Sequence, residues 1–201
     1  MFMLKKFLDS GSVWDIFQTL VTSQEYSNLL SNLLNGESEK IVLDLGCGTG
    51  KLSDYFLPEM YTGIDPSRSY ISVARLKFPE KKFVIGDHNY LENFENESVD
   101  LVLMWGVMHH IDDLNLRACV MQISRILKCG GVLLSLEPSI LLEPKTSIVE
   151  RFMMRLDYGA FIRKIEFYEK LVELGFQDFK VQSFRRLIRL PYHHALMRWL
   201  K

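Results

Sequence analysis

The sequence has few cysteines, no long apolar run and almost no net charge, and each of these absences excludes a class of protein. The three cysteines, Cys47, Cys119 and Cys129, are an odd number without paired spacing, so they predict neither a disulfide framework nor a structural zinc site. No stretch approaches the roughly 20 apolar residues of a membrane span. The apolar start is interrupted by Lys5 and Lys6, unlike a signal peptide. We expect a cytoplasmic protein without a metal site.

The charged residues nearly balance, with 24 Lys or Arg against 25 Asp or Glu. A net charge of -1 argues against a general polyanion binder, so we expect no nucleic-acid partner. Residues 145–201 nevertheless hold twelve basic against six acidic side chains. This part could present a basic surface to an acidic substrate or a membrane, or could be an ordinary solvated face.

From residue 41 onward, short apolar runs alternate with helical patterns. The runs with the length and character of buried parallel strands are 41–45, 61–64, 83–85, 99–104 and 132–136. The helical patterns between them are 51–57, 67–78 and 113–128. This alternation predicts an α/β fold in three layers, with a doubly wound, mostly parallel sheet between two layers of helices.

The last part of the chain departs from this alternation. A helical pattern at 165–174 precedes two β-like segments, 179–184 and 186–188, whose short connection predicts an antiparallel hairpin at one edge of a seven-stranded sheet. Pro191 would restrict the last strand to an edge or a bulge. We divide this single domain into a helical prefix (1–38), a core (39–138), a substrate-side insertion (139–164) and the last helix with its hairpin (165–201).

Three glycines, Gly46, Gly48 and Gly50, follow the first predicted strand, and a helical pattern begins at once. Such a loop lets the backbone approach a ligand that lies across the carboxyl end of the strand. Lys51 stands where a dinucleotide fingerprint needs a third glycine or an alanine, and the spacing from Gly46 to Lys51 is one residue too short for a P-loop. The loop therefore predicts a ligand site but disfavours a bound phosphate.

Three carboxylates lie at the predicted carboxyl ends of successive strands: Asp44 within the glycine motif, Asp65 after the second strand and Asp87 after the third. This acidic rim suits a cationic or polyhydroxylated ligand, and a carboxylate just beyond the second strand can accept both hydroxyls of a ribose. Taken singly, each of these residues could instead cap a turn or a helix.

In this order the motifs resemble those of the class I S-adenosylmethionine-dependent methyltransferases. The segments that carry the resemblance are 44–50, 63–65, 85–87, 99–103, 107–111 and 127–131. Cys129 stands where the family usually has proline in its LKPGG motif. The resemblance covers most of the chain and implies a Rossmann-like methyltransferase fold with S-adenosylmethionine as the cofactor.

The resemblance also implies roles for individual residues. Gly46, Cys47 and Gly48 would line the methionine part of the cofactor through their backbone, with Asp44 near its ammonium group. Asp65 would hold the ribose hydroxyls.

Asp87 would accept a hydrogen bond from the adenine amino group, with His88 beside it in backbone contact or stacking. Trp105, just past the fourth strand, would lie near the methionyl moiety. A packing role for Trp105 is an equal alternative.

His109 and His110 follow the fourth predicted strand and face the same crevice, which makes them candidate general bases. They could instead cap the next helix or fill the loop. Tyr158, Arg163 and His194 lie in the variable segments and could orient a methyl acceptor.

The sequence carries no Asn-Pro-Pro-Tyr motif after the fourth strand, so it gives no sign of adenine or amide methylation. The apolar residues Phe152, Met153 and Met154 of the insertion are compatible with a lipid-like or aromatic small molecule. We therefore predict methyl transfer to a small-molecule acceptor. The alternatives are a non-catalytic S-adenosylmethionine-binding protein and a nicotinamide-dependent oxidoreductase, of which Lys51 disfavours the second.

Overall fold

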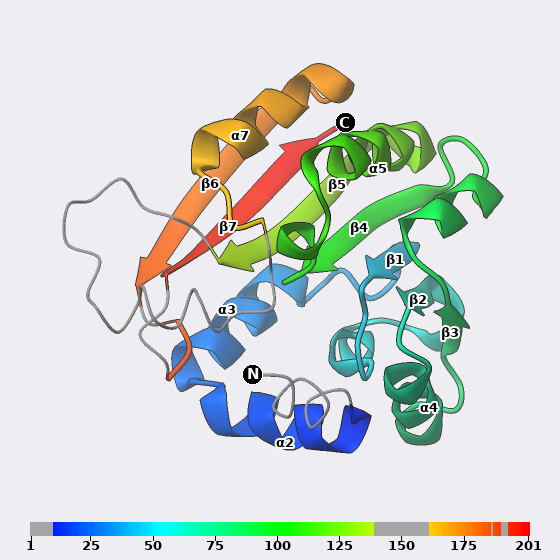
Figure 1. Ribbon diagram of the computed structural model, residues 1–201. Helices are drawn as coiled ribbons and strands as arrows, with labels where there is room; N and C mark the ends of the chain where they lie inside the picture. Colours follow the sequence, from blue (N-terminus) through cyan, green and yellow to red (C-terminus); the bar gives the residue numbers. More distant parts are fainter. Residues whose placement is uncertain (1–9, 139–160, 186, 190–192) are drawn as a thin grey trace.

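A seven-stranded sheet forms the centre of the protein. The computed structural model describes residues 10–138, 161–185, 187–189 and 193–201. The strands are β1 (Val42–Leu45), β2 (Tyr61–Asp65), β3 (Lys82–Ile85), β4 (Val99–Trp105), β5 (Leu127–Pro138), β6 (Asp178–Arg185) and β7 (His193–Leu200). Their order in the sheet is β3-β2-β1-β4-β5-β7-β6 (Figure 1). The first five strands are parallel, and β7 is antiparallel to both β5 and β6.

Helices cover both faces of this sheet. The α-helices are α2 (Gly11–Val21), α3 (Gln24–Leu34), α4 (Arg68–Lys77), α5 (Asp113–Ile126) and α7 (Ile165–Glu169). The short 3-10 helices are η1 (Lys51–Tyr55), η2 (Pro58–Met60), η3 (His88–Asn93), η4 (Met108–His110) and η5 (Lys170–Leu174). Figure 1 shows α5 and α7 on one side of the sheet and α2, α3 and α4 on the other. No helix in these ranges is both long and apolar enough to cross a membrane.

Two hydrophobic clusters separate the sheet from the two helical layers. On the α5 side, Leu116, Val120 and Ile123 recur at helical spacing and are fully buried against β4 and β5. On the opposite side, Leu30 and Leu34 of α3 pack with residues of β1, β4 and β5. The predicted α/β fold with three layers is therefore confirmed.

The end of the sheet differs from the sequence prediction in one respect. The second strand of the hairpin is 193–200 rather than 186–188, and it lies inside the sheet between β5 and β6 rather than at the edge. Its residues explain the position, because Ala195, Met197 and Trp199 are fully buried on one face while Leu196 is buried on the other. The exposed β6 forms the edge. Pro191 lies outside the described residues.

The strand order reverses between β1 and β4, which are hydrogen-bonded neighbours although two strands separate them in the sequence. From β1 the chain runs outward to β2 and β3 and then returns to β4. In open α/β sheets, ligands bind outside the carboxyl ends of the strands at such a switch point. The fold thus brings the loops that follow β1 and β4 together at the most favourable place for a ligand.

Candidate active site

The glycine loop after β1 has a left-handed backbone at each of its three glycines, with φ values of 80° at Gly46, 55° at Gly48 and 82° at Gly50. The amides of Gly46 and Cys47 both donate to the carbonyl of Ile64, at 2.7 and 3.0 Å, which folds the loop over β2. A Cβ at Gly48 would meet no atom within 4 Å. The backbone at Gly48 is therefore open to a ligand.

The glycine loop is also in direct contact with the loop after β4. A Cβ built on Gly46 would overlap Cγ2 of Val107, far closer than any real side chain could approach. Only glycine fits at this position, because its backbone conformation and the packing of Val107 both exclude a side chain. Gly46 of the glycine loop and Val107 of the loop after β4 therefore meet at the switch point.

Asp65 lies at the carboxyl end of β2 and supports the glycine loop. Its Oδ2 accepts a hydrogen bond from the amide of Gly48 at 2.9 Å, and its Oδ1 accepts one from the amide of Ser67 at 2.8 Å. Burial raises the pKa of Asp65, although these two amide bonds oppose the shift. Each carboxylate oxygen has a further lone pair, so the same side chain has capacity for the predicted ribose contacts.

Asp44 is a buried carboxylate beside the same loop, with 1% of its surface exposed. Its Oδ2 accepts a hydrogen bond from the hydroxyl of Tyr61 at 2.6 Å, and its Oδ1 is buried without a hydrogen-bond partner. Burial raises the pKa of Asp44 to about 7, against the effect of the Tyr61 bond. A cationic group that reached Oδ1 would relieve this cost, which fits the predicted place of an ammonium group.

The remaining predicted cofactor contacts follow β1, β3 and β4. Asp87 is exposed and caps η3 by accepting a hydrogen bond from the amide of Asn89 at 2.9 Å, and the half-buried His88 begins that helix. The thiol of Cys47 is buried, which raises its pKa well above the ordinary value. The cofactor roles of these residues stay predictions.

Trp105 ends β4 and contacts the N-terminal part of the chain. Its Nε1 donates a hydrogen bond to the hydroxyl of Tyr26 on α3 at 2.8 Å. Burial raises the pKa of Tyr26 to about 12, so this hydroxyl stays protonated at neutral pH. The packing role that we considered for Trp105 is therefore visible, and the predicted place near a methionyl group stays untested.

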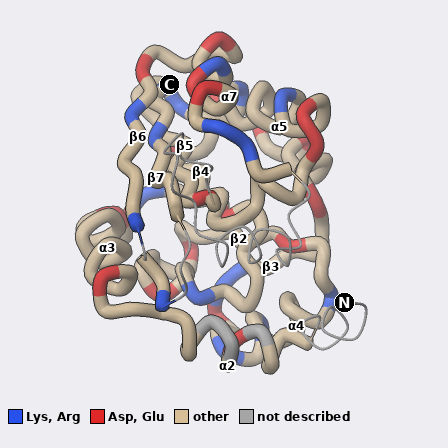
Figure 2. The backbone as a smooth tube through the Cα atoms, turned by 60° about the vertical axis from the view of Figure 1, so that its left-hand side comes forward, with Lys and Arg blue, Asp and Glu red and all other residues tan. Residues whose placement is uncertain are grey.

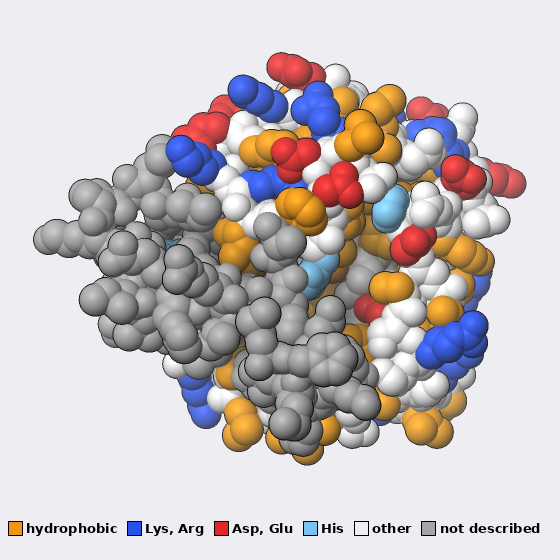
Figure 3. Space-filling model, viewed as in Figure 1, with side chains coloured by type: hydrophobic (Ala, Val, Ile, Leu, Met, Phe, Trp, Pro, Cys, Tyr) orange, Lys and Arg blue, Asp and Glu red, His pale blue; other side chains and the backbone are white. Residues whose placement is uncertain are grey.

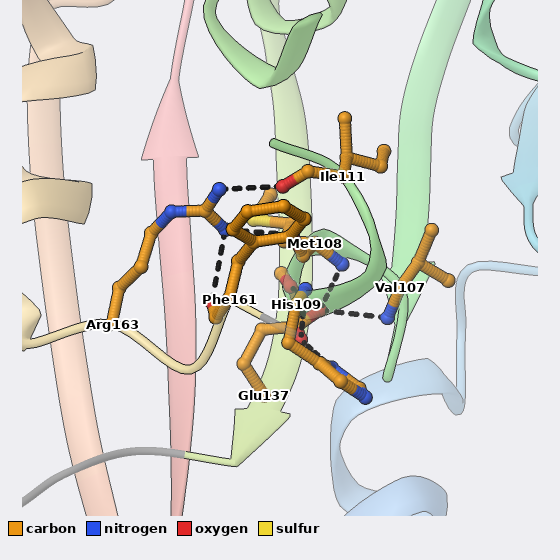
Figure 4. Close-up of polar contacts among 8 residues, drawn as sticks. Val107, Met108, His109, Ile111, Glu137, Phe161 and Arg163 are labelled. Carbon is orange, nitrogen blue, oxygen red and sulfur yellow. Dashed lines mark hydrogen bonds and ion pairs between the residues drawn. The ribbon is translucent and has the colours of Figure 1, made fainter. Parts of the chain in front are cut away.

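The histidine pair after β4 divides into a buried and an exposed residue. His109 is 5% exposed, whereas His110 is exposed, and their ring centroids lie 4.1 Å apart. Nδ1 of His109 lies 2.6 Å from Oε2 of Glu137, near the end of β5 (Figure 4). Glu137 was not predicted as a site residue, although a lone acidic residue at the end of an apolar strand was a signal that could have found it.

Glu137 is fully buried and is surrounded by hydrogen-bond donors. Its Oε1 accepts from the amides of Val107 and Met108, both at 2.9 Å, and from the hydroxyl of Ser135 at 3.1 Å. Burial favours the neutral carboxyl, but the bonds from His109 and from the backbone outweigh it and hold the pKa of Glu137 below its ordinary value. Glu137 is therefore an ionised carboxylate beneath residues 107–110, which carry the two histidines and are called the histidine loop below.

Arg163, a predicted acceptor contact, binds the outer side of the same loop. Its guanidinium donates to the carbonyl of Met108 at 2.8 Å and to the carbonyl of Ile111 (Figure 4). It also donates to Oδ1 of Asp113 at 2.7 Å. Arg163 is 7% exposed. Its hydrogen bonds to the carbonyls of Met108 and Ile111 hold the 108–111 segment in place. A role of Arg163 in acceptor binding stays a prediction.

The other two predicted acceptor contacts lie further along the chain. His194 is buried on β7, opposite Pro138 at the end of β5. Tyr158 lies outside the described residues. Figure 3 shows a hollow in the molecular surface close to the ends of β4 and β1, bordered by hydrophobic, acidic and histidine side chains.

The N-terminal helix α2 is attached to the glycine loop. The buried carboxylate of Asp15 accepts a hydrogen bond from the hydroxyl of Thr49 and forms an ion pair with Lys77 of α4. Gly11 packs closely against Val73 of α4. The position of the glycine loop therefore depends on α2 as well as on the sheet.

Charged groups are distributed over the whole molecule. Figure 2 shows basic residues along β6 and β7 and both signs of charge on α5 and α7. Lys201 lies in the basic part of the chain, and its Nζ donates a hydrogen bond to the carbonyl of Ser124. This ammonium group therefore takes part in contacts within the fold. Among the described residues, no three His, Cys, Asp or Glu side chains are grouped so that they could hold a metal ion.

Comparisons with known proteins found methyltransferases that are similar to this chain. Residues 42–131 match a family model described as a methyltransferase domain. An uncharacterised methyltransferase of Bacillus thuringiensis (strain Al Hakam) is 32% identical over 108 residues, which are 53% of this chain and 50% of the relative. The chain thus spans about half the length of the curated relatives it matches.

Solved structures resemble a larger part of the chain. An S-adenosylmethionine-dependent methyltransferase from Archaeoglobus fulgidus has a TM-score of 0.72 at 18% identity, covering 94% of this chain and 99% of its own. A methyltransferase from Thermotoga maritima, described as a possible histamine N-methyltransferase, has a TM-score of 0.71 at 20% identity and covers 98% and 97%. These findings confirm the predicted fold, and they show that residues 42–131 are similar to a methyltransferase domain.

Proposed function

We propose that this protein transfers a methyl group from S-adenosylmethionine to a small-molecule acceptor. The match of residues 42–131 to a methyltransferase family model and the likeness of the fold to that of an S-adenosylmethionine-dependent methyltransferase support the proposal. One observation carries the proposal: the buried, unpartnered Oδ1 of Asp44 lies beside a glycine loop whose backbone is open at Gly48, at the point where the strand order reverses. This combination suits an amino-acid nucleoside with a cationic end.

The bound cofactor would supply an electrophilic methyl group. The chain would contribute mainly binding and orientation, which can lower a reaction barrier by about 7–11 kcal/mol when the reactants are well aligned. Asp44 would pair with the ammonium group, Asp65 would accept the ribose hydroxyls, and Asp87 would accept from the adenine amino group. His88 and Trp105 would complete the walls of the site.

An acceptor whose nucleophilic atom carries a proton needs a base, and His109 and His110 are the candidates in the loop after β4. General-base catalysis raises the reaction rate about 100- to 10,000-fold where it is used.

We propose an acceptor with an amine, phenol or similar group on a lipid-like or aromatic body. Amines are the first class to test, because a similar structure from Thermotoga maritima is described as a possible histamine N-methyltransferase.

Isothermal titration tests the cofactor. We expect S-adenosylmethionine and its demethylated product to bind and NAD not to bind. Replacing Asp65 with Ala should weaken product binding by about 10- to 100-fold, the size expected when a charged hydrogen-bond acceptor is lost. Asp54→Ala, which removes an exposed carboxylate from the nearby η1, should bind like the unmodified protein. Binding of NAD alone would contradict the proposal.

A transfer assay separates the enzyme from its non-catalytic alternative. The unmodified protein is incubated with methyl-labelled S-adenosylmethionine and a panel of amines, phenols, carboxylic acids and thiols, and labelled product is measured. Transfer to any member supports an enzyme and gives the class of acceptor. Tight cofactor binding with no transfer to any class would favour the non-catalytic binding protein.

A further inference from the structure

Glu137 binds both the backbone and the side chain of the histidine loop. One oxygen, Oε1, accepts from Val107, Met108 and Ser135, and the other, Oε2, lies 2.6 Å from Nδ1 and 3.3 Å from the amide of His109. The carboxylate thus faces donors on both oxygens. Such a set of contacts holds the carboxylate in a single orientation.

These contacts decide where the imidazole of His109 carries its proton. An ionised carboxylate can only accept hydrogen bonds, so the nitrogen that faces it must donate. The short contact from Nδ1 to Oε2 therefore requires hydrogen on Nδ1. In a neutral imidazole with hydrogen on Nδ1, the lone pair that can accept a proton is on Nε2.

The outer part of the His109 ring lies close to the end of β4. In Figure 4 the ring of His109 leads away from Glu137, with its outer nitrogen directed away from the carboxylate. A Cβ on Gly106, at the end of β4, would lie 3.8 Å from Cε1 of His109. The next residue, Val107, touches Gly46 of the glycine loop. The ring therefore lies beside Gly106, one residue from the contact between Val107 and the glycine loop.

Other ionisable groups surround the pair without replacing Glu137. The ring of His110 lies beside that of His109 and is tilted by 41° from it. Arg163 donates to the carbonyl of Met108 and pairs with Asp113. Tyr168 of α7 is close enough to Glu137 and Arg163 for both to affect its pKa, which burial raises. Among these groups, the negative charge in hydrogen-bond contact with the His109 ring is that of Glu137.

We propose that Glu137 is a positioning residue that holds His109 with Nε2 ready to accept a proton, so that His109 rather than His110 is the general base. The inference rests on the proposed methyl transfer. As the bond from the acceptor atom to the methyl carbon forms, its hydrogen passes to Nε2 and the electron pair of the carbon–sulfur bond goes to sulfur. The resulting imidazolium is stabilised by Glu137 and later releases its proton to water.

Nitrogen-15 NMR of histidine-labelled protein tests the tautomer without any acceptor or cofactor. The signal of His109 is assigned by its loss in His109→Gln. We expect neutral His109 to carry hydrogen on Nδ1. In Glu137→Gln, the amide oxygen should keep the donors of Val107 and Met108, and the amide nitrogen should then donate to Nδ1. The tautomer of His109 should therefore reverse, as it does when the acid of a Ser-His-Asp triad becomes an amide.

Ser135→Ala is the matched control, because it removes a donor from Oε1 but not from the oxygen that faces His109. It should keep hydrogen on Nδ1. Hydrogen on Nε2 in the unmodified protein, or an unchanged tautomer in folded Glu137→Gln, would overturn the proposal. Should Glu137→Gln not fold, the spectra of the unmodified protein and of Ser135→Ala decide: hydrogen on Nδ1 in both supports it, and hydrogen on Nε2 in either overturns it.

Kinetics with an acceptor found in the transfer assay give the second readout. Glu137→Gln should lower kcat about 10- to 100-fold while the Kd of the demethylated cofactor changes less than twofold, because positioning of a base acts on the chemical step. Met121→Ala, an exposed change on α5, should keep the rate of the unmodified protein. Equal losses of cofactor affinity and kcat would indicate a purely structural Glu137. Absence of cofactor binding in the unmodified protein would instead reject the proposed function.

Discussion

Asp44 shows how a single residue can tie ligand binding to stability. Its pKa in the fold is about 7, raised from 3.8 by burial, so folding favours its protonated form. The stabilisation that this preference gives is fully present below pH 3.8 and is lost as the pH rises towards 7. Because a tenfold change in a protonation equilibrium is worth about 1.4 kcal/mol, the ligand-free protein is destabilised by a few kcal/mol above neutral pH.

Replacing Asp44 with Asn should therefore remove a pH dependence. We expect the free energy of unfolding of Asp44→Asn to change less between pH 4 and pH 8 than that of the unmodified protein, and to be higher at pH 8. Binding of the demethylated cofactor should weaken, because the amide lacks the charge that pairs with an ammonium group. Urea denaturation at both pH values, with and without this ligand, measures the two effects. A parallel pH dependence in the two proteins would contradict the prediction.

At the residue scale, the sequence predicts positions better than contacts. Asp44 and Asp65 lie at strand ends as expected, because the carboxyl ends of parallel strands meet at one edge. Glu137 was missed, since its role depends on amides of another loop that the sequence does not place beside it. Arg163 was predicted from its residue type, whereas its carbonyl partners required the fold.

At the scale of elements, α2 connects the N-terminal part of the chain to the glycine loop. Asp15 accepts from Thr49 inside the loop and pairs with Lys77 of α4. Thr49→Val keeps the shape of the side chain but removes the donor, leaving a buried carboxylate short of one partner. We expect faster amide hydrogen exchange in residues 11–21 and a several-fold weaker binding of the demethylated cofactor.

Ser12→Ala is the matched control for this helix, because Ser12 is exposed on α2. It should change neither the exchange of residues 11–21 nor the affinity. If Thr49→Val left the exchange of α2 unchanged while the protein stayed folded, the attachment of α2 through Asp15 would be of no consequence for the glycine loop.

The elements themselves differed in how well the sequence predicted them. The five parallel strands were found, since their short apolar runs lie between helix-stopping Pro and Gly residues. The strand β7 was missed, because its two histidines and Arg198 interrupt the apolar pattern, and its burial on both faces depends on pairing with β5 and β6. The helical pattern at 165–174 ends as a 3-10 turn, a difference that residue spacing does not reveal.

At the scale of the whole molecule, Trp199 connects the last strand, β7, to helix α7. It is fully buried, and its ring lies against that of Phe179 with the centroids 5.0 Å apart and the planes tilted by 41°. Its Nε1 donates a hydrogen bond to the carbonyl of Tyr168 at 3.2 Å. Trp199→Ala should lower the free energy of unfolding by about 3–5 kcal/mol. Trp199→Phe keeps a ring and should cost less. Urea denaturation followed by circular dichroism compares the two, and equal losses would contradict this explanation.

The contact between Gly46 and Val107 limits how this protein could be adapted to a new acceptor. In the proposed site the acceptor would lie beside the loop after β4, and Val107 of that loop packs directly on Gly46. A bulkier replacement at position 107 would press on the donor-binding backbone, so laboratory redesign of specificity would have to monitor affinity for the methyl donor in every variant.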